Sequence, residues 1–206
     1  MNTMTVQAAE ALARRAHDRQ VDKVGMPYFE THVQDVHRRV VAAGGSEDQQ
    51  VAALLHDVLE DTDVTETDLR AADISEPALQ LVLLMTKQDG EDTAVYLERI
   101  RDHESARLIK LADIAINTDP VRLARVDPDR RRKLLAKYAA YLEALNADAL
   151  RLRQALEDVP ASETPDERQM RLDRVLDERM AARLDELVEE DSFTTHEQYK
   201  QQRDGS

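Results

Sequence analysis

The sequence contains no cysteine and no tryptophan, and it has only five glycines and six prolines among 206 residues. Without cysteine it can form neither a disulfide framework nor a thiol-based active site, which suits a cytoplasmic protein. Runs of β-branched residues with alternating polarity are nearly absent, and so are the turn residues that would separate many short strands. We therefore expect an all-α protein.

Aromatic residues make up only 3% of the chain, although hydrophobic residues make up 42%. A core can form, but it must consist mainly of leucine, valine and alanine. No apolar run is long enough for a transmembrane helix, so we expect no membrane contact. The formal net charge of −14 argues against binding to nucleic acid or to an anionic membrane. A bound cation could still attract a small anionic ligand locally.

Capping patterns predict where several helices start. Two such patterns are Thr31-His32-Val33-Gln34 and Ser46-Glu47-Asp48-Gln49, and the second opens a helix that we expect to continue through Asp61. Asp127-Pro128 predicts the start of a long helix that reaches about Leu156. These patterns describe a helical bundle with short connections.

A linker over residues 160–165 precedes a third capping pattern, Thr164-Pro165-Asp166-Glu167. We expect one domain over residues 1–159 and a charged helical extension and tail over 160–206. The extension reaches about Glu190 and carries one apolar stripe, which we expect to pack on the bundle or on a second subunit in a homo-oligomer. The stripe consists of Leu172, Leu176, Met180, Leu184 and Leu187.

A cluster of charged groups ends the apolar run of residues 51–55. On a helix His56 lies four residues before Glu60, and Asp57 lies four before Asp61. One imidazole and three carboxylates then share a helix end, where the carboxylates repel one another unless a cation or a proton compensates. This pattern predicts a metal site.

A second polar feature interrupts the apolar stretch from 105 to 117. Asp113 is flanked by leucine, alanine and isoleucine, and Lys110, Asp113 and Asn117 share one helical face. With His32, the candidate metal ligands are His32, His56, Asp57 and Asp113, a set that suits Mn, Fe or Zn better than Ca. Each has a structural alternative: His32 as a helix-start residue, His56 and Asp57 as a buried pair, and Asp113 as the partner of Lys110.

Several segments, in order and at similar spacing over residues 10–145, resemble the HD-domain phosphohydrolases. The likeness is to the (p)ppGpp hydrolase domain of RelA/SpoT-type enzymes and of small stand-alone alarmone hydrolases. Its most specific segments are AALLHDVLEDT at 52–62 and IKLAD at 109–113. Weaker ones are AHDRQVDKVGMPY at 16–28 and MTK at 85–87.

This resemblance implies an all-α bundle around one manganese ion and removal of the 3′-pyrophosphate from (p)ppGpp. It implies Mn ligation by His32, His56, Asp57 and Asp113, and catalysis by Glu60 and Asp61 on the attacking water. It places four residues along an anionic nucleotide substrate: Lys23, Thr86, Lys87 and Asn117.

The main departure from the family is Asp22, which stands where the family has an arginine that meets the base. Asp22 either points to solvent or faces the substrate, and in the second case the base would be bound differently. Two other functions therefore stay open. The protein could act on another nucleotide, or it could be an inactive metal-binding scaffold whose contact is the 160–206 segment.

Overall fold

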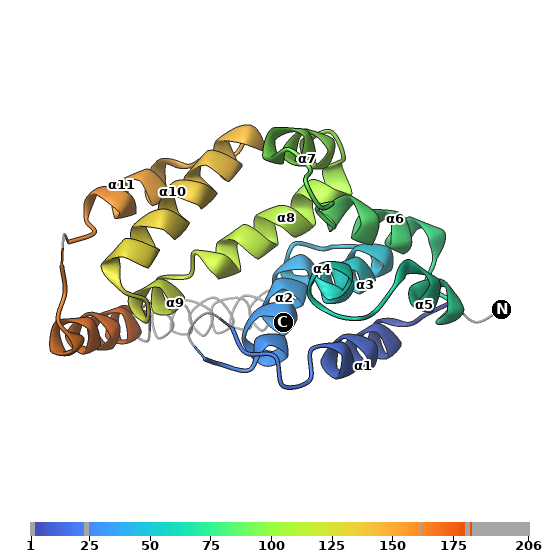
Figure 1. Ribbon diagram of the computed structural model, residues 1–206, viewed down its shortest axis with the longest axis horizontal. Coiled ribbons are helices and arrows are strands. Elements are labelled where there is room, and N and C mark those ends of the chain that lie inside the picture. The colour runs from blue at the N-terminus through green and yellow to red at the C-terminus, as the bar shows by residue number, and fades with distance from the viewer. Residues whose placement is uncertain (1–2, 23–24, 161, 180–181, 183–206) are drawn as a thin grey trace, which may run out of the picture.

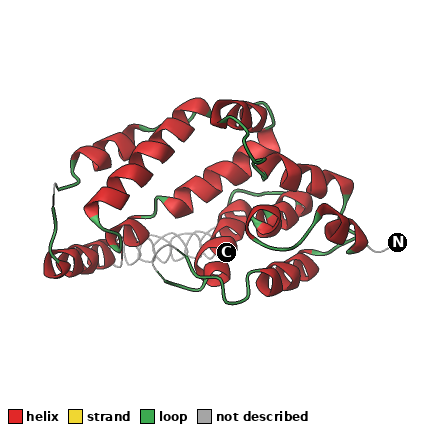
Figure 2. Ribbon diagram, viewed as in Figure 1, coloured by secondary structure: helices red, strands yellow, loops and turns green. Residues whose placement is uncertain are grey.

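The computed structural model describes residues 3–22, 25–160, 162–179 and 182. Over these residues the chain consists of helices and loops, with one isolated bridge between Val21 and Pro27 and no strand (Figure 1, Figure 2). The predicted all-α class is therefore confirmed. Within that part of the chain, no helix has both the length and the apolar character that crossing a membrane requires.

Helix α3 contacts α1, α2 and α6, and α8 packs against α2, α3, α6 and α7. Figure 1 shows α8 running from this group of helices towards α9 (Pro120–Ala124) and α10 (Pro128–Ala144). The bounds are α1 (Val6–Ala16), α2 (Gln34–Ala42), α3 (Glu47–Leu55), α4 (Val58–Asp61), α5 (Glu66–Ala71), α6 (Glu76–Met85), α7 (Thr93–Arg101) and α8 (Glu104–Asn117).

The core has the composition that the scarcity of aromatic residues predicts. Val36 and Val40 on α2 and Leu54 and Leu55 on α3 are fully buried, and Ile109 on α8 packs in the same cluster. Burying each such side chain contributes on the order of 1.5–3 kcal/mol. The core thus holds α2, α3 and α8 firmly against one another, and these helices carry or adjoin the predicted metal ligands.

The predicted helix start at Thr31 is wrong, because the helix begins earlier. A π-helical turn, η1 (Phe29–Val33), runs directly into α2. The Thr31 hydroxyl donates to the Pro27 carbonyl at 2.7 Å and caps no downstream amide. The capping box at Ser46 is confirmed: Ser46 N–H donates to Gln49 Oε1 at 2.7 Å, and Gln49 N–H donates to Ser46 Oγ at 3.3 Å.

The helix that Ser46 opens does not continue unbroken to Asp61. It ends at Leu55, and α4 starts after a turn at His56 and Asp57. The His56 ring bonds back to the Ala53 carbonyl through Nδ1 at 2.8 Å, and Asp57 adopts φ −106°. The turn therefore gives the two residues directions that a regular helix would not.

The long helix predicted from Asp127 starts there as expected, with Asp127 as its N-cap, but its predicted end near Leu156 is wrong, and a short helix before it was not foreseen. Helix α9 (Pro120–Ala124) precedes α10 (Pro128–Ala144), and α11 (Leu150–Glu157) packs back along α10. The chain reverses at Asn146, whose φ of +53° is left-handed. Asparagine tolerates that conformation better than most residues.

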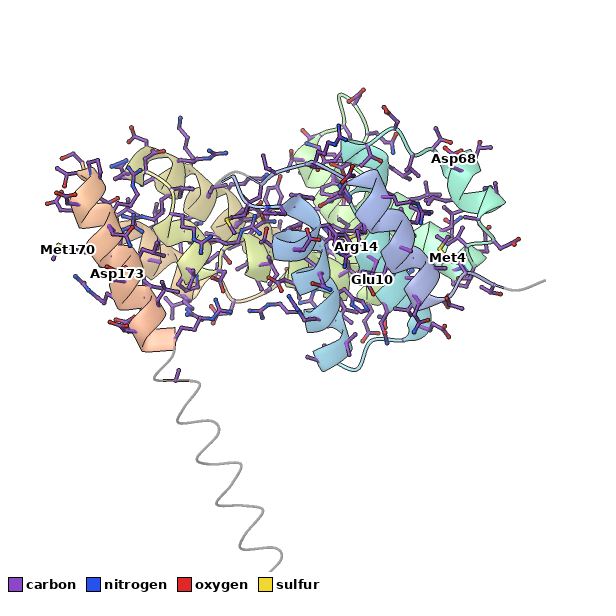
Figure 3. All side chains as sticks on the ribbon, turned by 90° about the horizontal axis from the view of Figure 1, so that it is seen from below. Met4, Glu10, Arg14, Asp68, Met170 and Asp173 are labelled. Carbon is purple, nitrogen blue, oxygen red and sulfur yellow. The ribbon has the colours of Figure 1, made fainter. Side chains whose placement is uncertain are left out.

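Residues 165–179 form a helical run at the opposite end of the molecule from Met4 and Asp68, as the labelled Met170 and Asp173 show (Figure 3). The capping box at Thr164 is confirmed by its reciprocal bonds with Glu167. Of the predicted apolar stripe, Leu172 is partly buried and Leu176 is 37% exposed. The other stripe residues and the helix end near 190 lie outside the described residues.

Candidate metal centre and active site

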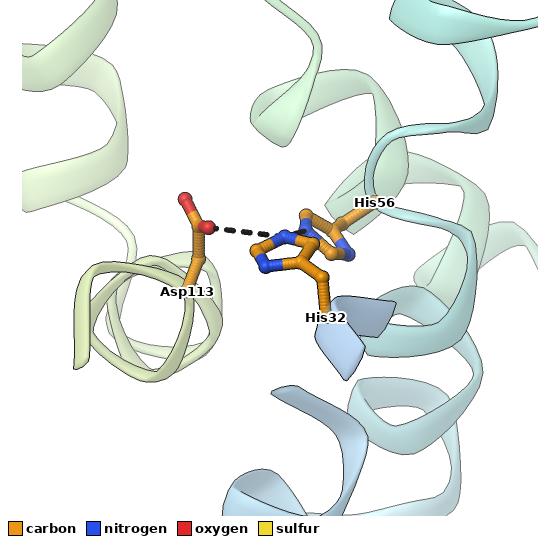
Figure 4. Close-up of side chains that lie close together, drawn as sticks. All are labelled: His32, His56 and Asp113. Atoms are coloured by element: carbon orange, nitrogen blue, oxygen red, sulfur yellow. Dashed lines mark hydrogen bonds and ion pairs between the residues drawn. The ribbon is translucent and has the colours of Figure 1, made fainter. Parts of the chain in front are cut away.

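Three elements bring the predicted ligands together at the centre of the bundle. η1 carries His32, the turn after α3 carries His56, and α8 carries Asp113 (Figure 4). All three side chains are buried, and their ligand atoms lie within 4.8 Å of one another. His32 Nε2 lies 3.3 Å from His56 Nε2 and 3.4 Å from Asp113 Oδ1.

Asp57 completes the cluster. Its Oδ2 lies 2.9 Å from His56 Nε2 and 3.3 Å from His32 Nε2. The Tyr28 hydroxyl donates to the same oxygen at 2.5 Å. Burial and the charge of Asp57 both raise the pKa of Tyr28, so this hydroxyl stays protonated and keeps donating.

The chemistry of these donors fits a divalent cation. His56 Nδ1 faces a backbone carbonyl and must carry the ring proton, so the neutral ring presents a lone pair at Nε2. His56 Nε2 lies close to His32 Nε2 and to the Asp57 carboxylate. Three groups that can bind a cation through a lone pair therefore face the same point. Donor atoms about 2.1 Å from a common ion lie about 3.0–3.4 Å apart, which matches the separations in this cluster.

The cluster also creates a strongly negative local field. Burial alone would lower the pKa of His56, but the charge and hydrogen bond of Asp57 raise it to about 9. Burial opposes ionisation of Asp57, yet His56 and His32 hold its pKa well below the usual range. The site therefore attracts positive charge, either as a proton or as a metal ion.

Asp113 has partners on both carboxylate oxygens. Lys110 Nζ lies 2.9 Å from Oδ2, and the Asn117 amide donates to Oδ1 at 2.5 Å. The predicted common face of Lys110, Asp113 and Asn117 is thus confirmed. Burial disfavours the charged form, but Lys110 keeps the pKa of Asp113 below its ordinary value. Partners of this kind orient a carboxylate for metal binding.

Glu60 and Asp61 lie on α4, one turn beyond Asp57. Glu60 Oε1 accepts the backbone N–H of Lys87 at 2.6 Å, and Asp61 Oδ2 accepts from Gln20 Nε2 at 3.2 Å. Burial raises the pKa of Glu60 although the Lys87 amide opposes the shift. Both carboxylates line a cavity of about 300 Å³ together with His32, Asp57 and Asp113.

Of the four residues predicted to contact the substrate, only one lines this cavity in the part of the chain that the structure describes. Asn117 lines this cavity. Thr86 is buried, with its hydroxyl donating to the Val82 carbonyl at 2.8 Å, and the Lys87 ammonium donates to Thr93 Oγ1 at 2.7 Å. Neither is among the residues that line the cavity. Lys23 lies outside the described residues.

Sequence reasoning assigned no role to several other lining residues. Tyr28 could have been found, since it belongs to the segment that carries the family resemblance. Arg122 gave no signal, because it lies far along the chain on the unforeseen helix α9. Its Nη2 lies 3.0 Å from Asp22 Oδ2, and the Asp22 side chain is 1% exposed. Asp22 therefore does not point to solvent, and its charge is paired.

No protein-family model matches the chain. Over 140 residues it is 29% identical to a guanosine-3′,5′-bis(diphosphate) 3′-pyrophosphohydrolase of Aquifex aeolicus (strain VF5), a match covering 64% of this chain and 19% of that protein. The chain thus spans about a fifth of that relative's length. Among solved structures it resembles a metazoan ortholog of SpoT described as hydrolysing ppGpp and acting in starvation responses. That match has a TM-score of 0.54 and 22% identity and covers 87% of this chain and 97% of the other. These findings support the resemblance seen in the sequence, and the structural match shows that the two proteins share an all-α fold.

Proposed function

We propose that this protein is a metal-dependent phosphohydrolase that removes the 3′-pyrophosphate of (p)ppGpp. The observation that carries the proposal is the convergence of His32, His56, Asp57 and Asp113. All of these but His56 line one cavity together with Glu60 and Asp61. The sequence similarity to a pyrophosphohydrolase supports the same substrate class.

In this proposal His32, His56, Asp57 and Asp113 hold one divalent cation, with Mn as the native ion. Two imidazoles and two carboxylates suit a borderline transition metal. When bound, such a cation supplies a nucleophile at neutral pH, because it lowers the pKa of water and offsets charge on phosphate oxygens. Tyr28, Lys110 and Asn117 keep the ligand carboxylates in place.

Glu60 is the proposed general base. One of its oxygens is fixed by the Lys87 amide, which leaves the other able to take a proton from the attacking water. Water attacks the phosphorus bonded to O3′, the P–O3′ bond breaks, and pyrophosphate departs with the water oxygen while O3′ regains a proton. Asp61, held by Gln20, orients the water on the same side.

The ion pair of Asp22 with Arg122 bears on how the substrate is bound. A free carboxylate at Asp22 would repel a polyphosphate, but Arg122 neutralises it and lines the same cavity. Among the remaining cavity residues, Lys110, Lys137 and Asn117 also carry hydrogen-bond donors. This arrangement removes the electrostatic objection that Asp22 raises against an alarmone substrate.

The test is a substrate panel with the purified full chain and Mn. We expect ppGpp and pppGpp to release pyrophosphate, and NADPH and deoxynucleotides to react more slowly. Turnover of another nucleotide without turnover of ppGpp would favour a different phosphohydrolase. If metal binds but no nucleotide in the panel reacts, the scaffold alternative is the better description.

A further inference from the structure

Arg131 on α10 is a buried arginine with an unsatisfied guanidinium nitrogen. The residue is 6% exposed, and its Nε is buried with no hydrogen bond. The Asp127 carboxylate, one turn earlier, caps the Arg130 amide instead. An arginine is rarely buried unless a carboxylate, a phosphate or carbonyl groups satisfy it, because leaving the charge unpaired is costly.

The acid that offsets part of the Arg131 charge is Glu163, and it already binds two other arginines. Glu163 binds Arg171 through contacts of 2.7 and 2.8 Å and Arg168 through one of 3.4 Å. Burial, and then the positive charge of Arg171, lower the pKa of Arg131, which reflects positive charge in excess of what Glu163 offsets. Glu163 therefore does not offset all of the positive charge around Arg131.

Arg131 lines an open cavity of about 400 Å³, to which α9, α10, α11 and the helical run 165–179 all contribute residues. Its walls are mainly aliphatic, with Leu123, Leu135, Leu152, Ala155, Val159 and Val175 among them. Volumes of about 300–1,000 Å³ with apolar walls and few polar groups are usual for small-molecule sites. None of its lining residues lines the cavity beside the metal cluster.

We propose that this cavity binds a small amphipathic monoanion, a carboxylate on an aliphatic body, with the carboxylate paired to the Arg131 guanidinium. The planar guanidinium matches a carboxylate in a bidentate geometry, and the aliphatic walls accept the hydrocarbon. A multiply charged phosphate fits less well, because the other two arginines of the lining are offset: Arg171 is bound to Glu163, and Asp158 and Glu178 line the cavity beside Arg151. This inference does not depend on the proposed hydrolase activity.

The test is calorimetric titration of the full chain with decanoate and, separately, with decanol, which has the same body without the charge. We expect decanoate to bind at least about 10-fold more tightly, the usual scale for a charged hydrogen bond. Arg131→Met should abolish that preference. Arg130→Met is the matched control, since Arg130 is exposed on the same helix and does not line this cavity, and it should bind like the wild type.

A second readout is the melting temperature of the ligand-free protein. Removing an unsatisfied buried charge should leave the melting temperature of Arg131→Met unchanged or raise it by about 2–4 °C. A clear fall would show that the guanidinium already has acceptors within the chain, which overturns the proposal. Equal binding of decanoate and decanol by the wild type would overturn it as well. So would a preference for decanoate that survives in Arg131→Met.

Discussion

Asp22 and Arg122 form an ion pair in which the aspartate is buried and the arginine partly buried, with 3.0 Å between Asp22 Oδ2 and Arg122 Nη2. Arg122 also donates to the Thr31 carbonyl at 2.7 Å. The pair ties the loop after α1 to helix α9, and the second bond reaches the residue before His32. The position at which this sequence departs from the pattern that it resembles thus has a structural role in this chain.

The first prediction concerns this pair. Asp22→Arg should lower the free energy of unfolding by about 3 kcal/mol or more, because it places two guanidiniums together in a buried site. Chemical denaturation monitored by circular dichroism measures the change. The double variant Asp22→Arg/Arg122→Asp should recover much of the loss, and the exposed Asp18→Arg should change little. An Asp22→Arg protein as stable as the wild type would show that the pair does not contribute.

The second prediction concerns metal binding. Asp113→Asn keeps the shape of the side chain and an acceptor for Lys110 but removes the ligand charge. We expect its Mn affinity to fall by more than about 100-fold, beyond the 10–100-fold typical of losing an outer partner. Elemental analysis after gel filtration measures the bound metal, and the exposed Asp129→Asn serves as control. Full occupancy in Asp113→Asn would refute the ligand assignment.

The third prediction separates the partner of a ligand from the ligand itself. Tyr28→Phe removes the hydroxyl that donates to Asp57 and leaves the ring in place. Metal affinity should fall by about 10–100-fold, less than for Asp113→Asn, while the fold is retained. Competition with a chromogenic chelator measures the difference. Unchanged affinity would mean that the hydrogen bond does not orient Asp57.

The fourth prediction concerns Glu60 and pH. Glu60→Gln should keep the metal and lose about 100-fold or more in kcat, as expected for a general base. Burial raises the pKa of Glu60 above 4.5, and only the carboxylate can accept a proton. Wild-type kcat should therefore fall as the pH drops through that raised pKa, and Glu60→Gln should lack this acid limb. A pH–rate profile with the same limb in both proteins would contradict the role.

The sequence predicts a structural feature well when the feature depends on residues that are close together in the chain, and poorly when it depends on tertiary contacts. The Ser46 and Thr164 capping boxes form as expected, because their hydrogen bonds span only three residues. The turn at His56 was missed because its residues have no strong helix-breaking tendency. The His56 side chain bonds to the Ala53 carbonyl, and tertiary contacts decide the rest.

The functional residues also divide into those that the sequence could indicate and those that only the folded structure reveals. His56, Asp57 and Asp113 could be chosen as candidates from the sequence, because they end or interrupt apolar stretches. His32 became a candidate only in combination with them, since alone it could be a helix-start residue. Arg122 could not be chosen, since its pairing with Asp22 joins segments that no periodicity connects. Arg131 stands in a run of basic residues over 130–132, and this run gives no local signal that one of them is buried.

The last prediction concerns residues 160–206, which we propose to be an extension that stabilises the bundle without building the metal site. Arg171 donates to the Leu123 and Val126 carbonyls, and Arg179 pairs with Asp119, the N-cap of α9. A chain ending at Val159 loses these contacts and exposes the aliphatic walls around Leu123. We expect a melting temperature lower by several degrees, while Mn affinity stays within about threefold because every ligand lies before residue 114. Differential scanning calorimetry and metal titration measure the two quantities.

Arg179→Met in the full chain is the matched control, since it removes only one exposed ion pair and should cost less than about 1 kcal/mol. A truncated chain as stable as the full one but without hydrolase activity would instead show that the extension acts on catalysis.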